Sequence, residues 1–193
     1  SDFDRLVGQI AQAETSAMKR REKLVFYINS YNILAARGIL DGHSPSSLWG
    51  RFVYFKLDKY TVAGEEITLF DLERERIIPL GEPRIHFAIV CASKSCPPLR
   101  NEAYTLPGLD EQLDFAARDF INDPDSNRFD AAAREALISK IFDWYEEEFE
   151  AAAGSLQKYL AGYVTDEEIA TMLREEAFDI DYRSYDWSLN GSL

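Results

Sequence analysis

Residues 22–40 constrain the fold most, because this stretch predicts a helix with apolar side chains on nearly every side. A helix of that kind is typical of a protein core. Asp41-Gly42 and the Ser-Pro-Ser run at residues 44–46 are expected to end it. The chain has 193 residues, of which 46% are hydrophobic and 13% aromatic, so it can build a core around this helix.

Strands are indicated by alternating or short apolar runs. Residues 52–69 alternate in the manner of strands, and residues 63–66 are predicted to form the turn of a hairpin. Residues 85–91 are predicted to form a short buried strand, because the run is short and rich in β-branched residues. Residues 178–182 alternate as a final strand.

Helices are indicated by spaced apolar positions and by capping residues. Thr68 and Asp71 predict the capped start of a short helix that runs to Ile78. A polar loop is expected at residues 123–130. Further helices are predicted at residues 2–21, 109–122, 139–149, 155–163 and 165–177. The fold class is therefore α+β: a helix-rich single domain over residues 1–193 around a small, mainly antiparallel sheet.

The charge of the chain excludes two classes of partner. A formal net charge of −13 and a pI near 4.6 oppose binding to nucleic acid and to anionic membrane surfaces. No uncharged apolar run approaches the roughly 18 residues of a transmembrane helix, so none is expected. A small molecule or a peptide remains as a ligand class. The sequence starts with Ser rather than Met, which is typical of a processed chain and leaves the compartment open.

Residues 91–100 hold both cysteines of the chain and follow an apolar run that carries His86. Cys91 and Cys96 are five positions apart, so either a disulfide or two thiols would fit this spacing. Cys96 could be a nucleophile if Lys94 points toward it, or a small buried hydrophobic residue. Dithiol redox chemistry is less favoured, because the spacing is longer than Cys-x-x-Cys.

His86 is the candidate base for such a thiol. On a straight strand it would lie about 16 Å from Cys91. Cys96 can therefore reach His86 only if the loop at residues 92–95 folds back along the strand. The alternative is a hydrogen-bonded core histidine, and the other histidine, His43, is expected to be a solvated turn residue.

Asn29 and Asn32 are three residues apart and share one face of the apolar helix. Burying an amide without a partner costs a few kcal/mol, so both side chains must find partners. Those partners could be the backbone of a neighbouring loop or a ligand.

Other polar residues carry weaker signals. Glu73 stands in a run of alternating charge that is typical of a solvated face. Lys140 opens an aromatic helix and could hold an anion, although core packing is the default for that helix. No zinc or calcium motif is visible, and no metal or cofactor is expected.

Four blocks of the sequence resemble the domain-of-unknown-function family 547, which occurs in bacteria, plants and animals. They lie at residues 26–32, 84–100, 139–145 and 185–190, and the resemblance runs from about residue 20 to the C-terminus. Many bacterial members look exported, so the resemblance is consistent with an extracytoplasmic location. The family often has Glu-His where this chain has Glu73-Arg74, so a family base at that position would be missing here.

Cys, His, paired Asn and Arg coincide in these blocks, which leads to a hypothesis of a thiol-dependent hydrolase or acyltransferase of the papain or transglutaminase type. Cys96 would be the nucleophile and His86 the base, with the imidazole oriented by Glu73 or Asn29. The substrate would be bound by Asn32, Arg100 and Lys140. The alternative is a non-catalytic domain that binds a peptide or small ligand, with structural cysteines.

Overall fold

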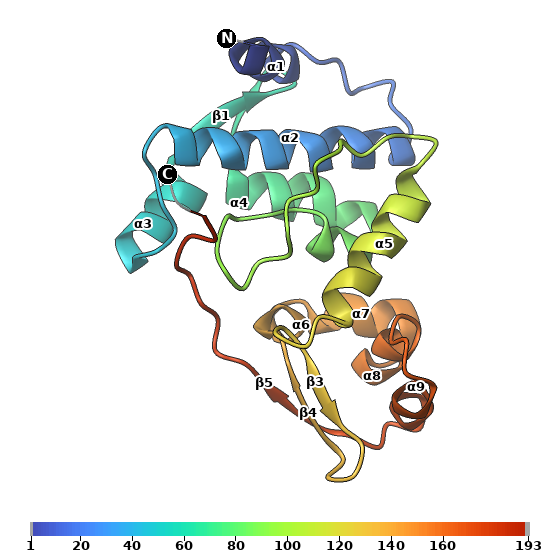
Figure 1. Cartoon of the computed structure of the whole chain (residues 1–193). Helices are drawn as coiled ribbons and strands as arrows, with labels where there is room; N and C mark the ends of the chain where they lie inside the picture. The colour runs from blue at the N-terminus through green and yellow to red at the C-terminus, as the bar shows by residue number, and fades with distance from the viewer. Residues whose placement is uncertain (1, 192–193) are drawn as a thin grey trace. The chain divides into compact units, whose positions relative to one another are not determined.

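The computed structural model describes residues 2–191, and the chain divides into two compact units. The first comprises Ser1–Gln112 together with Trp187–Leu193, and the second comprises Leu113–Asp186. Helices predominate in the described residues, with one small sheet of two strands and one of three (Figure 1). The predicted helix-rich α+β class is confirmed, although the strands form two sheets rather than one.

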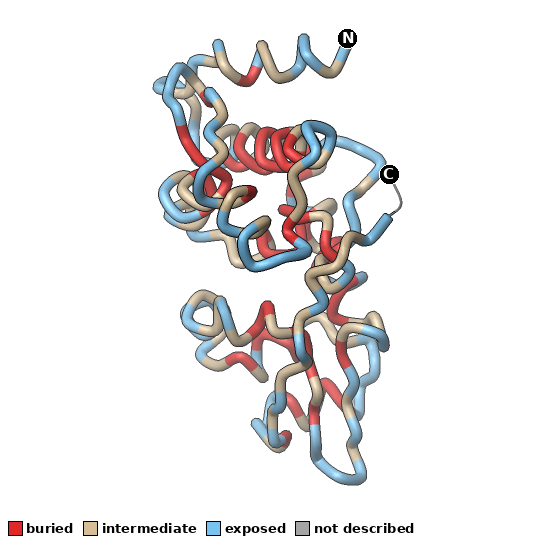
Figure 2. The backbone as a smooth tube through the Cα atoms, turned by 90° about the vertical axis from the view of Figure 1, so that its left-hand side faces the viewer, coloured by how far each residue is buried: buried red, intermediate tan, exposed pale blue. Residues whose placement is uncertain are grey.

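Helix α2 (Arg20–Leu40) forms the centre of the first unit, and the helix predicted at residues 22–40 is confirmed. The Glu22 carboxylate accepts a hydrogen bond from the Lys19 backbone N–H at 2.7 Å, which satisfies a donor at the helix start. Leu24, Ile28 and Leu34 are each at most 1% exposed. Figure 2 shows buried positions along much of this helix, as a helix without a polar face requires.

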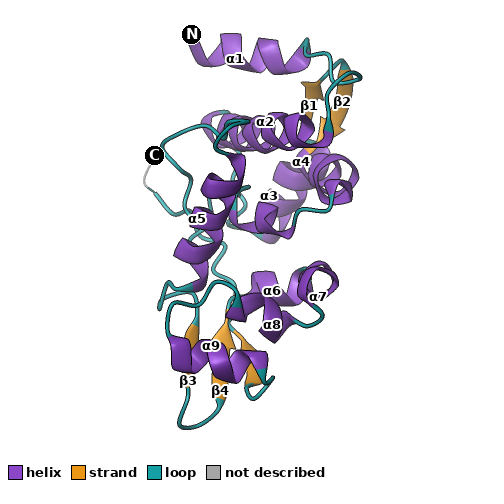
Figure 3. Ribbon diagram, turned by 90° about the vertical axis from the view of Figure 1, so that its right-hand side faces the viewer, coloured by secondary structure: helices purple, strands orange, loops and turns teal. Residues whose placement is uncertain are grey.

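A hairpin pairs β1 (Lys59–Val62) with β2 (Glu65–Thr68), and its predicted turn is confirmed. Ala63 and Gly64 both have positive φ, as this tight turn requires. Helix α1 (Asp2–Ala11) lies beside the hairpin (Figure 3), where its last carbonyls accept hydrogen bonds from the turn. This helix ends earlier than the predicted range of 2–21.

Residues 52–57 are helical, so the strand predicted there is wrong. Helix α3 (Leu48–Phe52) continues into a π-helix, η1 (Val53–Leu57). The Ser47 hydroxyl starts the helix by accepting a hydrogen bond from Gly50 N–H at 3.0 Å. Tyr54 is fully buried and donates to the Ala35 carbonyl of α2 at 2.9 Å. The apolar alternation therefore reflects packing of a helical segment onto α2 rather than a strand.

A short helical segment follows the hairpin, as predicted. Thr68 Oγ1 accepts a hydrogen bond from Asp71 N–H at 3.1 Å and so caps α4 (Leu69–Asp71). The chain continues as a π-helix, η2 (Leu72–Ile77), and a 3₁₀ turn, η3 (Ile78–Leu80). Gly81 ends the segment in the left-handed conformation, with φ of +65°.

Helix α5 (Leu109–Ile121) is predicted correctly, and its residues from Leu113 onward belong to the second unit. The strands of that unit are β3 (Arg128–Asp130), β4 (Glu135–Ile138) and β5 (Asp179–Tyr182). β4 pairs antiparallel with β3 and parallel with β5. The final strand was predicted, whereas β3 occupies part of the expected polar loop, because its short polar sequence shows no apolar alternation.

The helices of the second unit follow the predicted order. They are α6 (Lys140–Trp144), α7 (Glu146–Ala153), α8 (Leu156–Ala161) and α9 (Glu167–Arg174). The predicted helix over residues 139–149 is interrupted at Tyr145. Phe142 and Phe149 are fully buried, with ring centroids 5.4 Å apart, so this aromatic stripe forms core as expected.

Candidate functional site

The loop that carries both cysteines folds back on itself. Cys96 N–H donates to the Ser93 carbonyl at 3.1 Å, and Cys91 N–H donates to the Cys96 sulfur at 3.0 Å. Neither cysteine is in a disulfide; Cys91 is buried and Cys96 is partly exposed. The Cys91 thiol shares a hydrogen bond with the Ser93 hydroxyl at 3.0 Å. The sequence allowed either a disulfide or two thiols. The structure has two thiols, and their surroundings differ.

Residues 188–190 lie along this loop. Lys94 N–H donates to the Ser188 carbonyl at 2.8 Å, and Asn190 N–H donates to the Ala92 carbonyl at 3.0 Å. Ser93 and Leu189 form an antiparallel bridge between these two bonds. Ala92 has φ of +59°, a conformation that a residue with a Cβ adopts only at a cost in free energy.

Residues 85–91 are not a strand, so that prediction is wrong. Residues Pro83–Phe87 form a 3₁₀ helix, η4, which is capped by Glu82. Pro83 fits the first turn of a helix because its missing N–H needs no partner there. Ala88 N–H and Ile89 N–H donate to the Ile85 carbonyl, so local bonds replace the bonds of a strand. His86 lies in this helix and is 3% exposed.

The side chain of Asn32 makes hydrogen bonds with the backbone that follows η4. Its Nδ2 donates to the Ala88 carbonyl at 2.8 Å, and its Oδ1 accepts from Val90 N–H at 2.9 Å. Asn32 itself is buried, with 9% exposed. The side chain thus acts as a neighbouring strand would, directly before Cys91.

Asn29 makes the same pair of bonds to another part of the chain. Its Nδ2 donates to the Tyr104 carbonyl at 2.8 Å, and its Oδ1 accepts from Tyr104 N–H at 2.9 Å. The prediction that both amides need specific partners is confirmed, and loop backbone provides them. Neither pair of bonds involves His86.

Glu73 is buried, with 8% exposed, so its assignment to a solvated face is wrong. It lies in η2 beside the buried Leu72, whereas the following Arg74 and Glu75 are exposed. Alternating charge alone could not identify which member of the run points inward. A buried carboxylate needs a partner to offset its loss of hydration.

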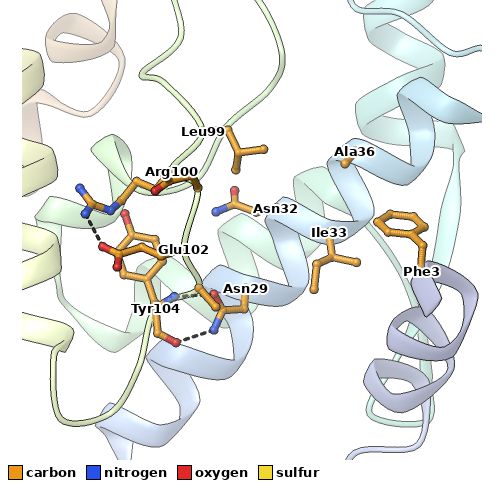
Figure 4. A pocket seen from close by; sticks show the side chains of 11 residues that line it. Phe3, Asn29, Asn32, Ile33, Ala36, Leu99, Arg100, Glu102 and Tyr104 are labelled. Atoms are coloured by element: carbon orange, nitrogen blue, oxygen red, sulfur yellow. Dashed lines mark hydrogen bonds and ion pairs between the residues drawn. The ribbon is translucent and has the colours of Figure 1, made fainter.

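Arg100 pairs with Glu102 at the wall of a hollow of about 330 Å³ (Figure 4). The guanidinium group lowers the pKa of the Glu102 carboxyl by hydrogen bonding. The hollow lies between α1, α2 and the loop after the thiols, and its lining mixes apolar side chains with amides and the Arg100–Glu102 pair. It is lined by Phe3, Asn29, Asn32, Ile33, Ala36 and residues 99–104.

Lys140 belongs to the second unit, where its ammonium group lies 2.7 Å from an Asp143 carboxylate oxygen. The same group lies 5.3 Å from the centre of the Tyr182 ring. Burial first, and then nearby carboxylates with Glu146 foremost among them, together raise the pKa of Tyr182 to about 12. The contacts of Lys140 are therefore local to its own unit.

His43 and Tyr54 lie in environments that differ from those predicted from the sequence. His43 pairs through Nδ1 with the Asp58 carboxylate and is not a purely solvated turn residue. Tyr54 lies within electrostatic reach of Cys91 and Cys96; burial raises its pKa, and the two thiols raise it further. The only sequence signal for Tyr54 was its place in an aromatic run that indicated a strand.

Within residues 2–191, no group of three or more His, Cys, Asp or Glu side chains is arranged to hold a metal ion. In the same part of the chain, no helix has the length and apolar character needed to cross a membrane.

A model of the family described as protein of unknown function, DUF547, matches residues 15–121. The chain belongs to this family. The DUF547 match covers α2, η2, η4 and the thiol loop, whereas residues 139–145 and 185–190 lie outside it. No curated protein and no solved structure matches the chain.

Proposed function

We propose that the chain is a thiol-dependent hydrolase or acyltransferase with Cys96 as its nucleophile. The observation that carries this proposal is the hydrogen bond from Cys91 N–H to the sulfur of Cys96. A backbone donor aimed at sulfur stabilises a thiolate over a thiol, and the thiolate is the reactive form. Cys96 is also partly exposed, which a nucleophile requires.

His86 is the proposed base, and Glu73 is the residue proposed to orient it. Few of the buried residues of the first unit are polar. Within residues 2–112, these two are the only buried ones that are Asp, Glu or His. A base needs a third group to fix its tautomer. Asn29 is a weaker candidate for that role, because both ends of its amide bind Tyr104.

The proposed reaction is acyl transfer through a thioester. The proton of Cys96 passes to His86, and the sulfur forms a bond to the substrate carbonyl carbon. The bond to the leaving group then breaks, and the leaving group takes the proton from the imidazolium. Water, or an acceptor amine or hydroxyl, attacks the thioester and regenerates the thiol.

We propose that the hollow beside α2 binds part of the substrate. Leu99 and Arg100 line it and follow Cys96 by three and four residues, so their Cα atoms lie within about 15 Å of that of Cys96. A substrate carboxylate at Arg100 would have to replace Glu102, whereas Asn32 acts through the backbone it holds. Lys140 is a weaker candidate for substrate binding because it pairs with Asp143.

Iodoacetamide labelling across pH 5–10 tests the proposal. Cys96 is expected to be alkylated well below pH 8.5, about the pKa of an ordinary thiol. Cys96→Ala should remove this fast labelling. Cys91→Ala is the matched control, because it keeps the backbone N–H that faces the sulfur and should leave the profile unchanged. Labelling of Cys96 that rises only above pH 8.5 would overturn the proposal.

A non-catalytic binding domain is the second candidate. The observation that favours it is the lining of the hollow, which includes neither Cys96 nor His86 among the described residues. Under this alternative, Cys96→Ala would keep any ligand affinity. A two-dalton mass difference between oxidised and reduced protein would also favour it, since a bridge would make the cysteines structural.

A further inference from the structure

Residues 188–190 follow the second unit in the sequence, but they lie against the thiol loop of the first unit. Residues 188–190 run antiparallel to residues 92–94, with the two backbone bonds and the bridge described above. Figure 1 shows this last segment, in red, arriving beside α3. The loop between the cysteines therefore obtains its strand partner from a part of the chain outside the family match.

Trp187 anchors this segment to the first unit. Its ring meets the Phe55 ring edge to face, with centroids 6.2 Å apart, and the Arg51 guanidinium carbon lies 4.6 Å from its centre. The Phe55 ring in turn contacts the Tyr54 ring, with centroids 4.8 Å apart, and the Tyr54 hydroxyl is hydrogen-bonded to α2. These contacts with Phe55 and Arg51 fix the position of Trp187, and with it the path of residues 188–190.

Ala92 connects this segment to the sulfur. Its left-handed conformation is unfavourable for an alanine, and its carbonyl is the acceptor for Asn190 N–H. Ala92 follows Cys91, whose N–H points at Cys96. If Ala92 relaxed to negative φ, the chain direction after Cys91 would change and the N–H···S bond would be broken.

We propose that residues 187–190 are a positioning segment for the Cys96 thiol, with Trp187 as its anchor. The segment holds Ala92 at positive φ and so keeps the Cys91 N–H directed at the sulfur. This inference rests on the proposed role of Cys96. It adds that residues outside the family match control how reactive that thiol is.

A chain that ends at Asp186 tests the inference by iodoacetamide labelling across pH. The profile of Cys96 should move up in pH toward that of an ordinary thiol. For a thiol pKa above 7, a rise of one pH unit in that pKa should lower the labelling rate at pH 7 about tenfold. A chain that ends at Gly191 keeps all the bonds described and is the control. A synthetic peptide of residues 187–193, added to the shorter chain, should restore the original profile.

Point variants provide the test if the shorter chain does not fold. Trp187→Ala should slow labelling at pH 7, and Trp187→Phe should recover part of the rate. Adding Ala92→Gly to Trp187→Ala should also recover it, because glycine adopts positive φ without a clash. A purely structural role for Trp187 would not be rescued by a change at residue 92.

The outcomes separate the two proposals. If the intact chain shows only ordinary thiol behaviour, the proposed function fails. If the intact chain is reactive at neutral pH and the chain ending at Asp186, or the folded Trp187→Ala variant, is equally reactive, only the positioning role is overturned.

Discussion

The β1–β2 hairpin and residues 83–104 belong to the same unit but satisfy their backbones in different ways. The two strands of the hairpin pair with each other through four successive residue pairs across a two-residue turn, and the turn N–H groups donate to α1. Residues 83–104 depend on distant groups: Asn32 at Ala88 and Val90, Asn29 at Tyr104, and residues 188–190 at the thiol loop. Local bonds make a region self-sufficient, whereas distant bonds make its shape depend on the rest of the fold. The candidate site lies in the second kind of region.

Asn32→Ala should cause the largest loss of stability, because it leaves two buried backbone groups without their partner. We expect the free energy of unfolding to fall by about 2–4 kcal/mol. Urea denaturation measures this loss. Asn29→Ala is the matched control and should cost less, since its bonds are only part-buried and water can replace them. Equal losses would contradict a greater structural role for Asn32.

Gly38→Ala should have the next largest effect, because Gly38 lies where the hairpin and η1 pack on α2. An added Cβ would come within 2.7 Å of the Tyr60 hydroxyl of the hairpin and 2.9 Å of the Tyr54 ring. We expect a loss of about 1–3 kcal/mol by denaturation. Gly8→Ala in α1 meets nothing within 4 Å and should instead stabilise by up to about 1 kcal/mol. The same sign for both variants would contradict this interpretation.

Gly64→Ala should act on the hairpin and on its contact with α1. Gly64 has φ of +82°, so alanine there should cost about 1 kcal/mol in thermal or urea unfolding. Because none of the hydrogen bonds described for the thiol loop involves the hairpin, the rate of Cys96 alkylation in the folded protein should not change. A large change in that rate would mean that the two regions are coupled.

Asp110→Asn should have the smallest effect, and that effect should depend on pH. Hydrogen bonding to Arg21, and then to Arg84, lowers the pKa of Asp110 from its usual 3.8. A lowered pKa adds stability above the unfolded value, and this stability is lost as the pH falls through the folded value. The variant should melt slightly lower than wild type at pH 7, with the difference disappearing well below pH 3.8. A difference that grew in acid would contradict the assignment.

Much of the fold could be predicted because its signals are local. The apolar helix at residues 22–40, the Thr68 cap and the alternation at residues 178–182 each reflect neighbours in sequence. Residues 85–91 looked like a strand because their composition is that of one. Their bonding partners lie elsewhere, in the side chain of Asn32, and composition does not reveal a partner more than fifty residues away.

For the candidate site, the sequence predicted that two buried amides need partners, but it did not identify those partners. The need of Asn29 and Asn32 for partners follows from the cost of burying amides, and the structure confirms it. The burial of Glu73 does not follow, because it stands in a run of alternating charge whose next two members, Arg74 and Glu75, are exposed. The pairing of residues 92–94 with 188–190 joins parts of the sequence that share no pattern.

Native-state hydrogen exchange tests most directly whether distant groups hold the thiol segment. The amides of Val90, Cys91 and Lys94 each have a specific acceptor: Asn32 Oδ1, Cys96 Sγ and the Ser188 carbonyl. All three should exchange about as slowly as amides in the middle of α2. Exchange of these amides at the rate of an open loop would contradict the account.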